Sequence, residues 1–135
     1  MSQNDTLRLA QEFLGRMGSD AEPTEIAKLF SETLEWDIAG DTGALPWIGH
    51  KSGRAAITDF VRDSRAMIDR ITFEVHDILA SDKRAAILGS LTSKLKRNGN
   101  VVTTDFAIVL TVANGEIVRF QMLEDSLAVS QMARG

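Results

Sequence analysis

Hydrophobic positions follow two different periods along the chain, and the change falls near residue 71. Before this point, apolar residues such as Leu9, Phe13 and Met17 recur three or four positions apart, which is the spacing of a helix with one buried stripe. From Ile71 onward they recur at every second position, as on a strand with one buried face. The pattern predicts helices first and a sheet afterwards.

The first half divides at its capping residues, prolines and glycines. Asn4 or Asp5 can cap the first helix, and Pro23 with Glu25 in the next turn is typical of a helix start. The expected elements are a helix from Asn4 or Asp5 to about Met17, a helix from Pro23-Thr24 that buries residues up to Phe30, a strand at Leu34–Ile38, and a helix capped by Ser52 that runs to Ile68.

The second half predicts four strands, at about 71–80, 84–96, 101–112 and 116–124. A two-residue type I′ turn at Asn98-Gly99 would place Leu95 opposite Val102.

The last hairpin, around Asn114-Gly115, allows two registers. A two-residue turn sets Ile108 opposite Gln121, whereas a three-residue loop with Gly115 left-handed sets it opposite Phe120. We prefer the three-residue loop because it pairs apolar with apolar, and a slip of one residue reverses a whole face.

With these registers the sheet has one polar and one apolar face. The apolar face carries Ile87, Gly89, Leu91, Leu95, Phe106, Ile108, Leu110, Val118, Phe120 and Met122, and it ends in Thr104 and Glu124. Amphipathic helices must cover such a face. The predicted fold class is therefore α+β, a cone-shaped half-barrel of three N-terminal helices on a curved, mainly antiparallel sheet, formed by a single domain over residues 1–135.

Composition narrows the function. The chain has 135 residues, a net charge of −4, two His, no Cys and no Tyr. A mildly acidic chain without a basic block does not favour nucleic acid, and no apolar run reaches the length of a membrane span. We expect no metal and no cofactor, because neither metal-ligand spacing nor a phosphate-binding glycine motif is present. The N-terminus has no signal-peptide pattern, so we expect a cytoplasmic protein. Acid–base chemistry would depend on carboxylates.

Four segments together resemble the nuclear transport factor 2-like superfamily, on its SnoaL-like polyketide cyclase and ketosteroid isomerase-like side. They are LFSETLEWDIAG, LPWIGHKSGRAAITDF, HDILASDKRAAILG and FAIVLTVANGEIVRFQMLED. The resemblance implies a cystatin-like cone with a pocket between helices and sheet, and a homodimer through the sheet. It also implies that Asp37, at the end of the first strand, is the general base.

The same resemblance has gaps. The isomerases complete their site with a Tyr and a protonated Asp, but Phe13 stands at the position of the Tyr. A carboxylate that the epoxide hydrolases use falls near Met122. The cyclases support their Asp with a His, and by strand alternation His76 points away from the pocket.

Each candidate acid also has a structural interpretation. In this interpretation Asp37 only caps the turn at Gly40, and Glu124 caps the C-terminal segment. A three-residue loop at 81–83 puts Asp77 on the same face as Val75, where an unpaired carboxylate is costly. We favour the alternative for this residue, in which the register shifts by one and Asp77 is solvated.

The predicted ligand-binding residues are apolar. They are Phe13, Met17, Trp47, Phe60, Phe106, Ile108 and Met122, with Trp47 either a lid that stacks on a planar ligand or a plug that closes the cone. Two functions stay open at this point. One is a cofactor-free isomerase, cyclase or dehydratase acting on a small hydrophobic, steroid-, terpenoid- or polyketide-like substrate. The other is a non-catalytic ligand-binding or dimeric scaffold domain.

Overall fold

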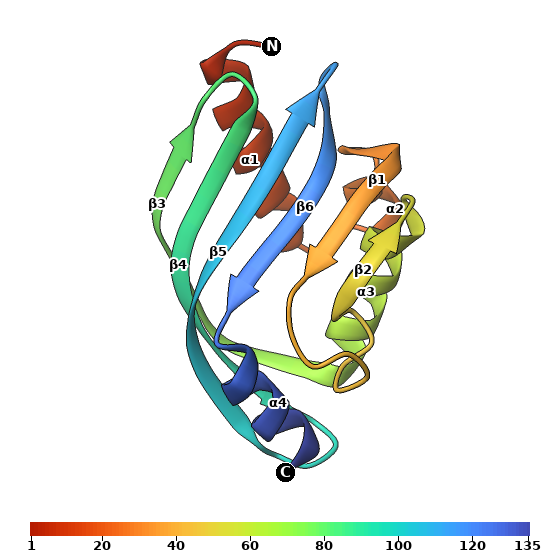
Figure 1. The fold of residues 1–135 in the computed structure, drawn as a ribbon, viewed down its shortest axis with the longest axis vertical. Coiled ribbons are helices and arrows are strands. Elements are labelled where there is room, and N and C mark those ends of the chain that lie inside the picture. The colour runs from red at the N-terminus through yellow and green to blue at the C-terminus, as the bar shows by residue number, and fades with distance from the viewer.

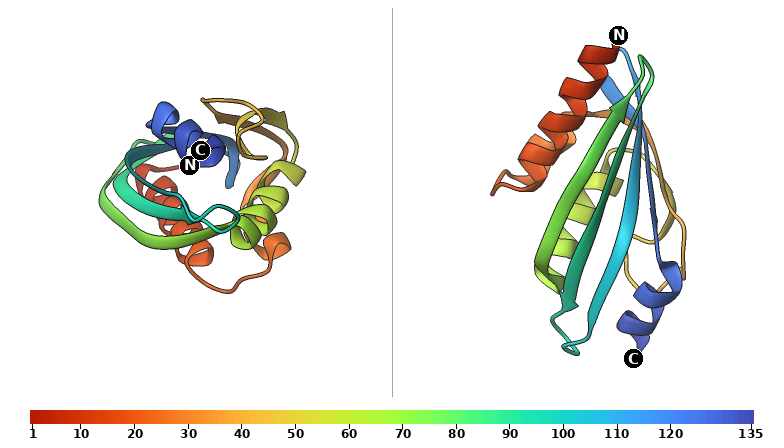
Figure 2. Two further views of the ribbon diagram at one scale, coloured as in Figure 1. Left: turned by 90° about the horizontal axis from the view of Figure 1, so that it is seen from below. Right: turned by 90° about the vertical axis from the view of Figure 1, so that its left-hand side faces the viewer.

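A computed structural model describes residues 1–135 and shows a strongly curved, open six-stranded sheet with helices on its concave side (Figures 1 and 2). The elements are α1 (Gln3–Met17), α2 (Pro23–Ala27), β1 (Phe30–Ile38), β2 (Gly49–Ser52), α3 (Ala55–Met67), β3 (Ile68–Ala80), β4 (Arg84–Leu95), β5 (Val101–Ala113), β6 (Glu116–Glu124) and α4 (Ser126–Arg134). The strand order is β2-β1-β6-β5-β4-β3, and only the β1–β6 pair is parallel. The predicted α+β class is confirmed. None of the helices has the length and apolar character needed to cross a membrane.

The helices differ from prediction mainly at their ends. The cap of α1 is Ser2, whose hydroxyl accepts from the Asp5 amide while the Asp5 carboxylate accepts from the Ser2 amide. This reciprocal pair is a capping box. Helix α2 ends at Ala27, so Phe30 begins a strand instead. Ser52 lies in β2, and α3 starts three residues later.

The β4–β5 hairpin is shifted from the predicted register by two residues. Lys94 pairs with Val101, and Gly89 pairs with Phe106. The connection is five residues long, over 96–100, rather than a two-residue turn at Asn98-Gly99. A shift of two leaves every side chain on its predicted face, because strand side chains alternate with a period of two.

The β5–β6 hairpin reaches the predicted faces by a different route. Its turn is the two-residue Asn114-Gly115, with both residues at positive φ, as a type I′ turn requires. A bulge after Thr111 then shifts the register, so that Ile108 pairs with Met122. The predicted three-residue loop is wrong, and so is the placement of Val118, since Ile117 takes the buried position.

Strand β3 contains two irregularities that decide which side chains face inward. The register against β4 shifts between Arg70 and Thr72 and again between Val75 and Asp77. At the second shift β3 comes very close to Gly89 of β4. A Cβ on Gly89 would lie 2.0 Å from the Glu74 carbonyl oxygen and 2.8 Å from the Phe106 ring. Only glycine fits at this point.

Substitution of Gly89 by alanine is therefore expected to destabilise the fold by about 1–3 kcal/mol, the usual cost of overpacking. Chemical denaturation of the two proteins measures the difference. Gly15 is the matched control, because a Cβ there meets nothing within 4 Å and alanine is a better helix former than glycine. Equal stabilities of the Gly89→Ala and wild-type proteins would contradict the close approach of the two strands.

Helix α4, which the sequence analysis did not predict, is held at the end of the molecule opposite the N-terminus (Figure 1). A carbonyl group near its C-terminus accepts from side chains of the β4–β5 connection: Asn98 and Asn100 both donate to the Met132 oxygen at 3.1 Å. Asp41 accepts from Arg134 and Ser130. These partners hold the pKa of Asp41 down at about 2. The helix thus closes this end of the curved sheet.

Candidate active site

A cavity of about 550 Å³ lies between the helices and the concave face of the sheet. Helices α1 and α3 form one side, and strands β3, β5 and β6 form the other. Eleven of its fifteen lining residues are hydrophobic. A concave, mainly apolar cavity of this size is typical of a small-molecule site.

Five of the seven predicted ligand-binding residues line this cavity: Phe13, Met17, Phe60, Ile108 and Met122. The other two, Phe106 and Trp47, do not line the cavity but pack against residues that do. Phe106 stacks on the lining residue Phe73, with ring centroids 4.9 Å apart. Trp47 places its ring edge-to-face with Phe60 at 5.6 Å, a position that supports the wall and agrees with a plug rather than a lid. Contact of the five lining residues with a ligand stays a prediction.

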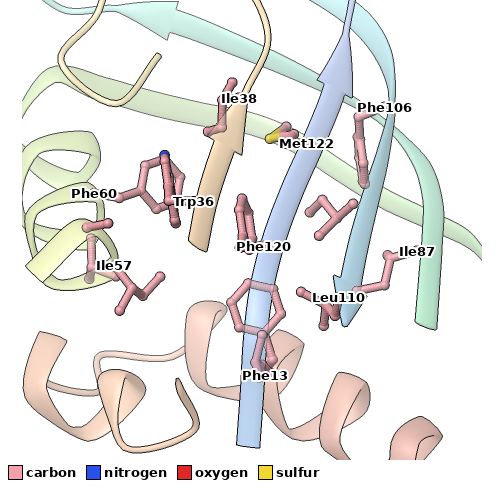
Figure 3. Close-up of a cluster of buried hydrophobic side chains, with 14 of the residues drawn as sticks. Phe13, Trp36, Ile38, Ile57, Phe60, Ile87, Phe106, Leu110, Phe120 and Met122 are labelled. Atoms are coloured by element: carbon pink, nitrogen blue, oxygen red, sulfur yellow. The ribbon is translucent and has the colours of Figure 1, made fainter. Parts of the chain in front are cut away.

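Trp36 organises the aromatic cluster beside the cavity (Figure 3). It is fully buried, stacks on Phe120 at 4.3 Å and lies 5.3 Å from the Phe60 ring. Its indole N–H donates to the Trp47 carbonyl at 3.0 Å. Leu34, Trp36 and Ile38 alternate toward the core, so Trp36 packs under α3 without lining the cavity itself.

Asp37 lies on the opposite, convex face of the sheet. It pairs with His50 across β1–β2, and its carboxylate is 3.4 Å from the Arg119 guanidinium. The predicted position beside the cavity is therefore wrong, since a strand that turns Trp36 inward must turn its neighbour outward. His76 also points outward, near Glu74 and Ser90.

Asp77 is exposed on the convex side. This agrees with the alternative that we favoured from the sequence, because a buried unpaired carboxylate would be costly. The irregularity after Val75 reverses the alternation, so Val75 lines the cavity and Asp77 does not. Such bulges re-aim the side chains that follow them. Asp77 is thus not positioned to act in the cavity.

Glu124 is the one predicted acid that lies on the concave face. It ends β6 two residues after the lining residue Met122 and pairs with Phe106. Across the cavity edge stands Arg70, a lining residue of β3. Arg70 places its guanidinium carbon 5.3 Å from the centroid of the Phe73 ring. Glu124, Arg70 and the two stacked phenylalanines thus form one corner of the site.

The surroundings of this corner shift the pKa values of both Glu124 and Arg70. Burial raises the pKa of the half-buried Glu124, and the positive charge of Arg70 partly opposes that rise. Much of the Arg70 side chain remains accessible to water, yet the protein around its guanidinium removes enough water to lower its pKa. A carboxyl group whose pKa moves up toward neutrality can accept and return protons efficiently.

The connection between α1 and α2 borders the cavity. Arg65 of α3 holds this connection by hydrogen bonds. Its guanidinium donates to the Ala21 carbonyl at 2.7 Å and to the Ser19 carbonyl at 3.0 Å. Arg65 also lines the cavity. Arg65 and Arg70 are the only ionisable residues in the lining, and neither was predicted from the sequence. Arg70 follows the partly buried Ile68 by two positions, but this spacing is a weak signal because a bulge comes directly after Arg70.

Comparison with protein families now adds to this geometry. The model of the SnoaL-like domain matches residues 10–120. The chain belongs to the SnoaL-like family. The matched region contains every lining residue of the cavity of this SnoaL-like protein except Met122. A comparison with curated proteins finds no significant match.

Solved structures share the same fold at low sequence identity. A nuclear transport factor 2-like protein from Burkholderia xenovorans is 21% identical with a TM-score of 0.88, and the match covers 98% of both chains. A protein described as a SnoaL-like polyketide cyclase from Mesorhizobium loti is 16% identical with a TM-score of 0.70, over 86% of this chain and 96% of that one. TerC, co-crystallised with polyporic acid, is 18% identical with a TM-score of 0.78, over 97% and 99%. These likenesses establish the fold of the SnoaL-like chain.

Proposed function

We propose that this SnoaL-like protein is a cofactor-free enzyme that isomerises, cyclises or dehydrates a small hydrophobic substrate, with Glu124 as the group that moves the proton. The observation that carries the proposal is the position of Glu124. Glu124 is not itself a lining residue, but it lies on the same sheet face as the lining residue Met122, and its carboxylate interacts with the charge of the lining residue Arg70. Glu124 takes the role that the family resemblance assigned to Asp37.

The chemistry needs only a proton relay. The Glu124 carboxylate accepts a proton from a carbon next to a carbonyl group of the substrate, and the electron pair of the broken C–H bond moves toward the carbonyl oxygen. The same carboxyl group then returns the proton to another atom of the substrate, so that no other reactant is needed. The raised pKa of Glu124 favours both steps, because a base works best when its pKa is near the working pH.

The apolar lining favours a steroid-, terpenoid- or polyketide-like substrate. Phe13 and Phe60 contribute aromatic rings to the lining from two helices, and Phe120 contributes a third from the sheet. Aromatic walls of this kind suit a cyclic molecule. The polyporic acid of TerC and the polyketide cyclase description of the Mesorhizobium loti protein support the same substrate class.

A second candidate function is binding without turnover. It is favoured by the lining itself, in which no carboxylate or histidine occurs and the only ionisable residues are Arg65 and Arg70. In that case the cavity holds the same class of molecule, and Glu124 only adjusts the charge at its edge. A ligand screen tests what both candidates share, and a proton-exchange measurement separates them.

We expect one compound class in a thermal-shift panel of steroids, terpenoids and polyketide-like aromatics to raise the melting temperature. A ligand at 100 times its Kd stabilises by about 2.7 kcal/mol, which amounts to several degrees for a domain of this size. Ser64→Phe should abolish the shift because Ser64 lines the cavity. Ala66→Phe is the matched control on an exposed position of α3. A shift that survives Ser64→Phe, or no shift from any class, would contradict binding in this cavity.

A further inference from the structure

Arg70 is a cation without a partner in a mainly apolar cavity. The other two arginines near this region are occupied: Arg65 donates to two carbonyl groups, and Arg62 pairs with Asp63 and Asp59. Arg70 forms no hydrogen bond and no ion pair within the protein, and its guanidinium lies only over the Phe73 ring. All five of its N–H groups are therefore available to a ligand.

The fold holds this guanidinium at the cavity. Arg70 pairs with Ser93 of β4, on the concave side, and the irregularity that follows it lets Phe73 line the cavity as well. Phe73 stacks on Phe106, so the aromatic surface under the guanidinium is itself fixed. An arginine that rests on an aromatic ring keeps its planar set of donors in one orientation.

The charge balance of the lining also favours an anion. No lining residue is acidic, and two are arginines. Glu124 is the acid whose charge acts on Arg70, but it does not come close enough to form an ion pair, and its burial favours the protonated form. A partly dehydrated guanidinium regains most from an acceptor that is itself charged.

We propose that the cavity selects hydrophobic molecules that carry a carboxylate, and that Arg70 binds the carboxylate while the aromatic walls hold the apolar body. This inference rests on the proposed function only in using the same cavity, and it names the substrate class more narrowly. Arg70 is a specificity-determining residue in this scheme. It orients the substrate by its acidic end, and Glu124 remains free to act on the carbon skeleton.

A matched acid and alcohol test the inference directly. N-phenyl-1-naphthylamine is a neutral fluorescent probe of apolar cavities, and decanoate and 1-decanol compete with it as chains of equal length with different heads. At pH 8 we expect wild-type protein to bind decanoate about 10- to 100-fold more tightly than decanol, as a charged hydrogen bond predicts. Arg70→Met should abolish this preference by weakening decanoate binding, without weakening the binding of the probe or of decanol.

Further variants separate charge from geometry. Arg70→Lys should retain part of the preference, because lysine keeps the charge but lacks the planar donor set. Arg62→Met, at an exposed position of α3 outside the lining, should behave as wild type. Glu124→Gln should tighten decanoate binding and leave decanol unaffected, since it removes the nearby negative charge.

The outcomes distinguish this inference from the proposed function. Binding of decanol with no preference for decanoate, or a preference that persists in Arg70→Met, overturns the role of Arg70 and leaves the cavity intact as a binding site. Failure of the neutral probe and both competitors to bind wild-type protein overturns the binding cavity, and the role of Arg70 with it. Probe binding by Arg70→Met that is no weaker than by wild type serves as the control for folding.

Discussion

Replacement of Glu124 by glutamine is expected to slow proton transfer in the cavity by about 10²- to 10⁴-fold, the usual contribution of a general base. Glutamine keeps the size of the side chain but cannot accept the proton. The measurement is the rate at which a ligand found in the thermal-shift panel takes up deuterium from D₂O, followed by NMR. This assay detects the proton transfer even where the final product is unknown.

Asp37→Asn is the matched control for this experiment. Asp37 lies on the convex face, paired with Arg119, so its replacement should leave the exchange rate unchanged. The wild-type rate should also decline at acid pH, because a protonated Glu124 cannot accept a proton. A Glu124→Gln protein that exchanges as fast as wild type would reject the enzyme and leave binding alone as the function. Loss of exchange in Asp37→Asn would return the base to the position that the family resemblance gives it.

Glu124→Gln also shows how much the burial of Glu124 lowers the stability of the folded protein. Burial raises the pKa of Glu124 in the folded protein, so the folded state binds this proton more tightly than the unfolded state. Stability then falls as pH rises from the ordinary glutamate pKa through the raised one. Glu124→Gln should therefore be more stable than wild type at neutral pH, and the two should converge below the ordinary glutamate pKa. An exposed, structurally neutral glutamate would show no such difference.

Hydrophobic periodicity predicts the strands well because burial of one sheet face fixes their alternation. It cannot predict where alternation is interrupted. The bulge after Val75 turns Asp77 outward, and the bulge after Thr111 exchanges Ile117 for Val118 in the core. Each bulge inserts one residue and requires little change in the sequence pattern, so neither bulge leaves a clear local signal. Gly89 comes nearest to such a signal, because a glycine inside a strand pattern often marks a close approach of two strands.

Hydrophobic periodicity also made part of the candidate site predictable. The apolar lining follows from the buried stripes of α1 and α3 and from the concave face, so most of its residues could be named. The spacing of Leu34, Trp36 and Ile38 also suffices to turn Asp37 outward, and the assignment taken from the family resemblance was wrong where it overrode this spacing. Arg70 could not be predicted, because its inward direction depends on three-dimensional pairing with Ser93.

Replacement of Trp36 by alanine is expected to lower the free energy of unfolding by about 3–5 kcal/mol, as for other large core aromatics. The side chain is fully buried and its ring stacks on Phe120. Trp36→Phe should cost less, because it keeps an aromatic ring there and loses mainly the bond to the Trp47 carbonyl, worth about 1–3 kcal/mol when the acceptor stays unpaired. Urea denaturation followed by circular dichroism measures both. Leu127→Ala, at a position 67% exposed, should change stability by no more than about 0.5 kcal/mol.

The two Trp36 variants also link the core to the site. Phe60 and Phe120 contact Trp36 on one side and line the cavity on the other. Trp36→Ala should therefore weaken ligand binding as well as stability, since both rings lose their support, whereas Trp36→Phe should keep most of the affinity. The neutral probe N-phenyl-1-naphthylamine measures this at a temperature where each variant is folded. Full affinity in a folded Trp36→Ala protein would show that the cavity wall is held by α3 and β6 alone, without the tryptophan between them.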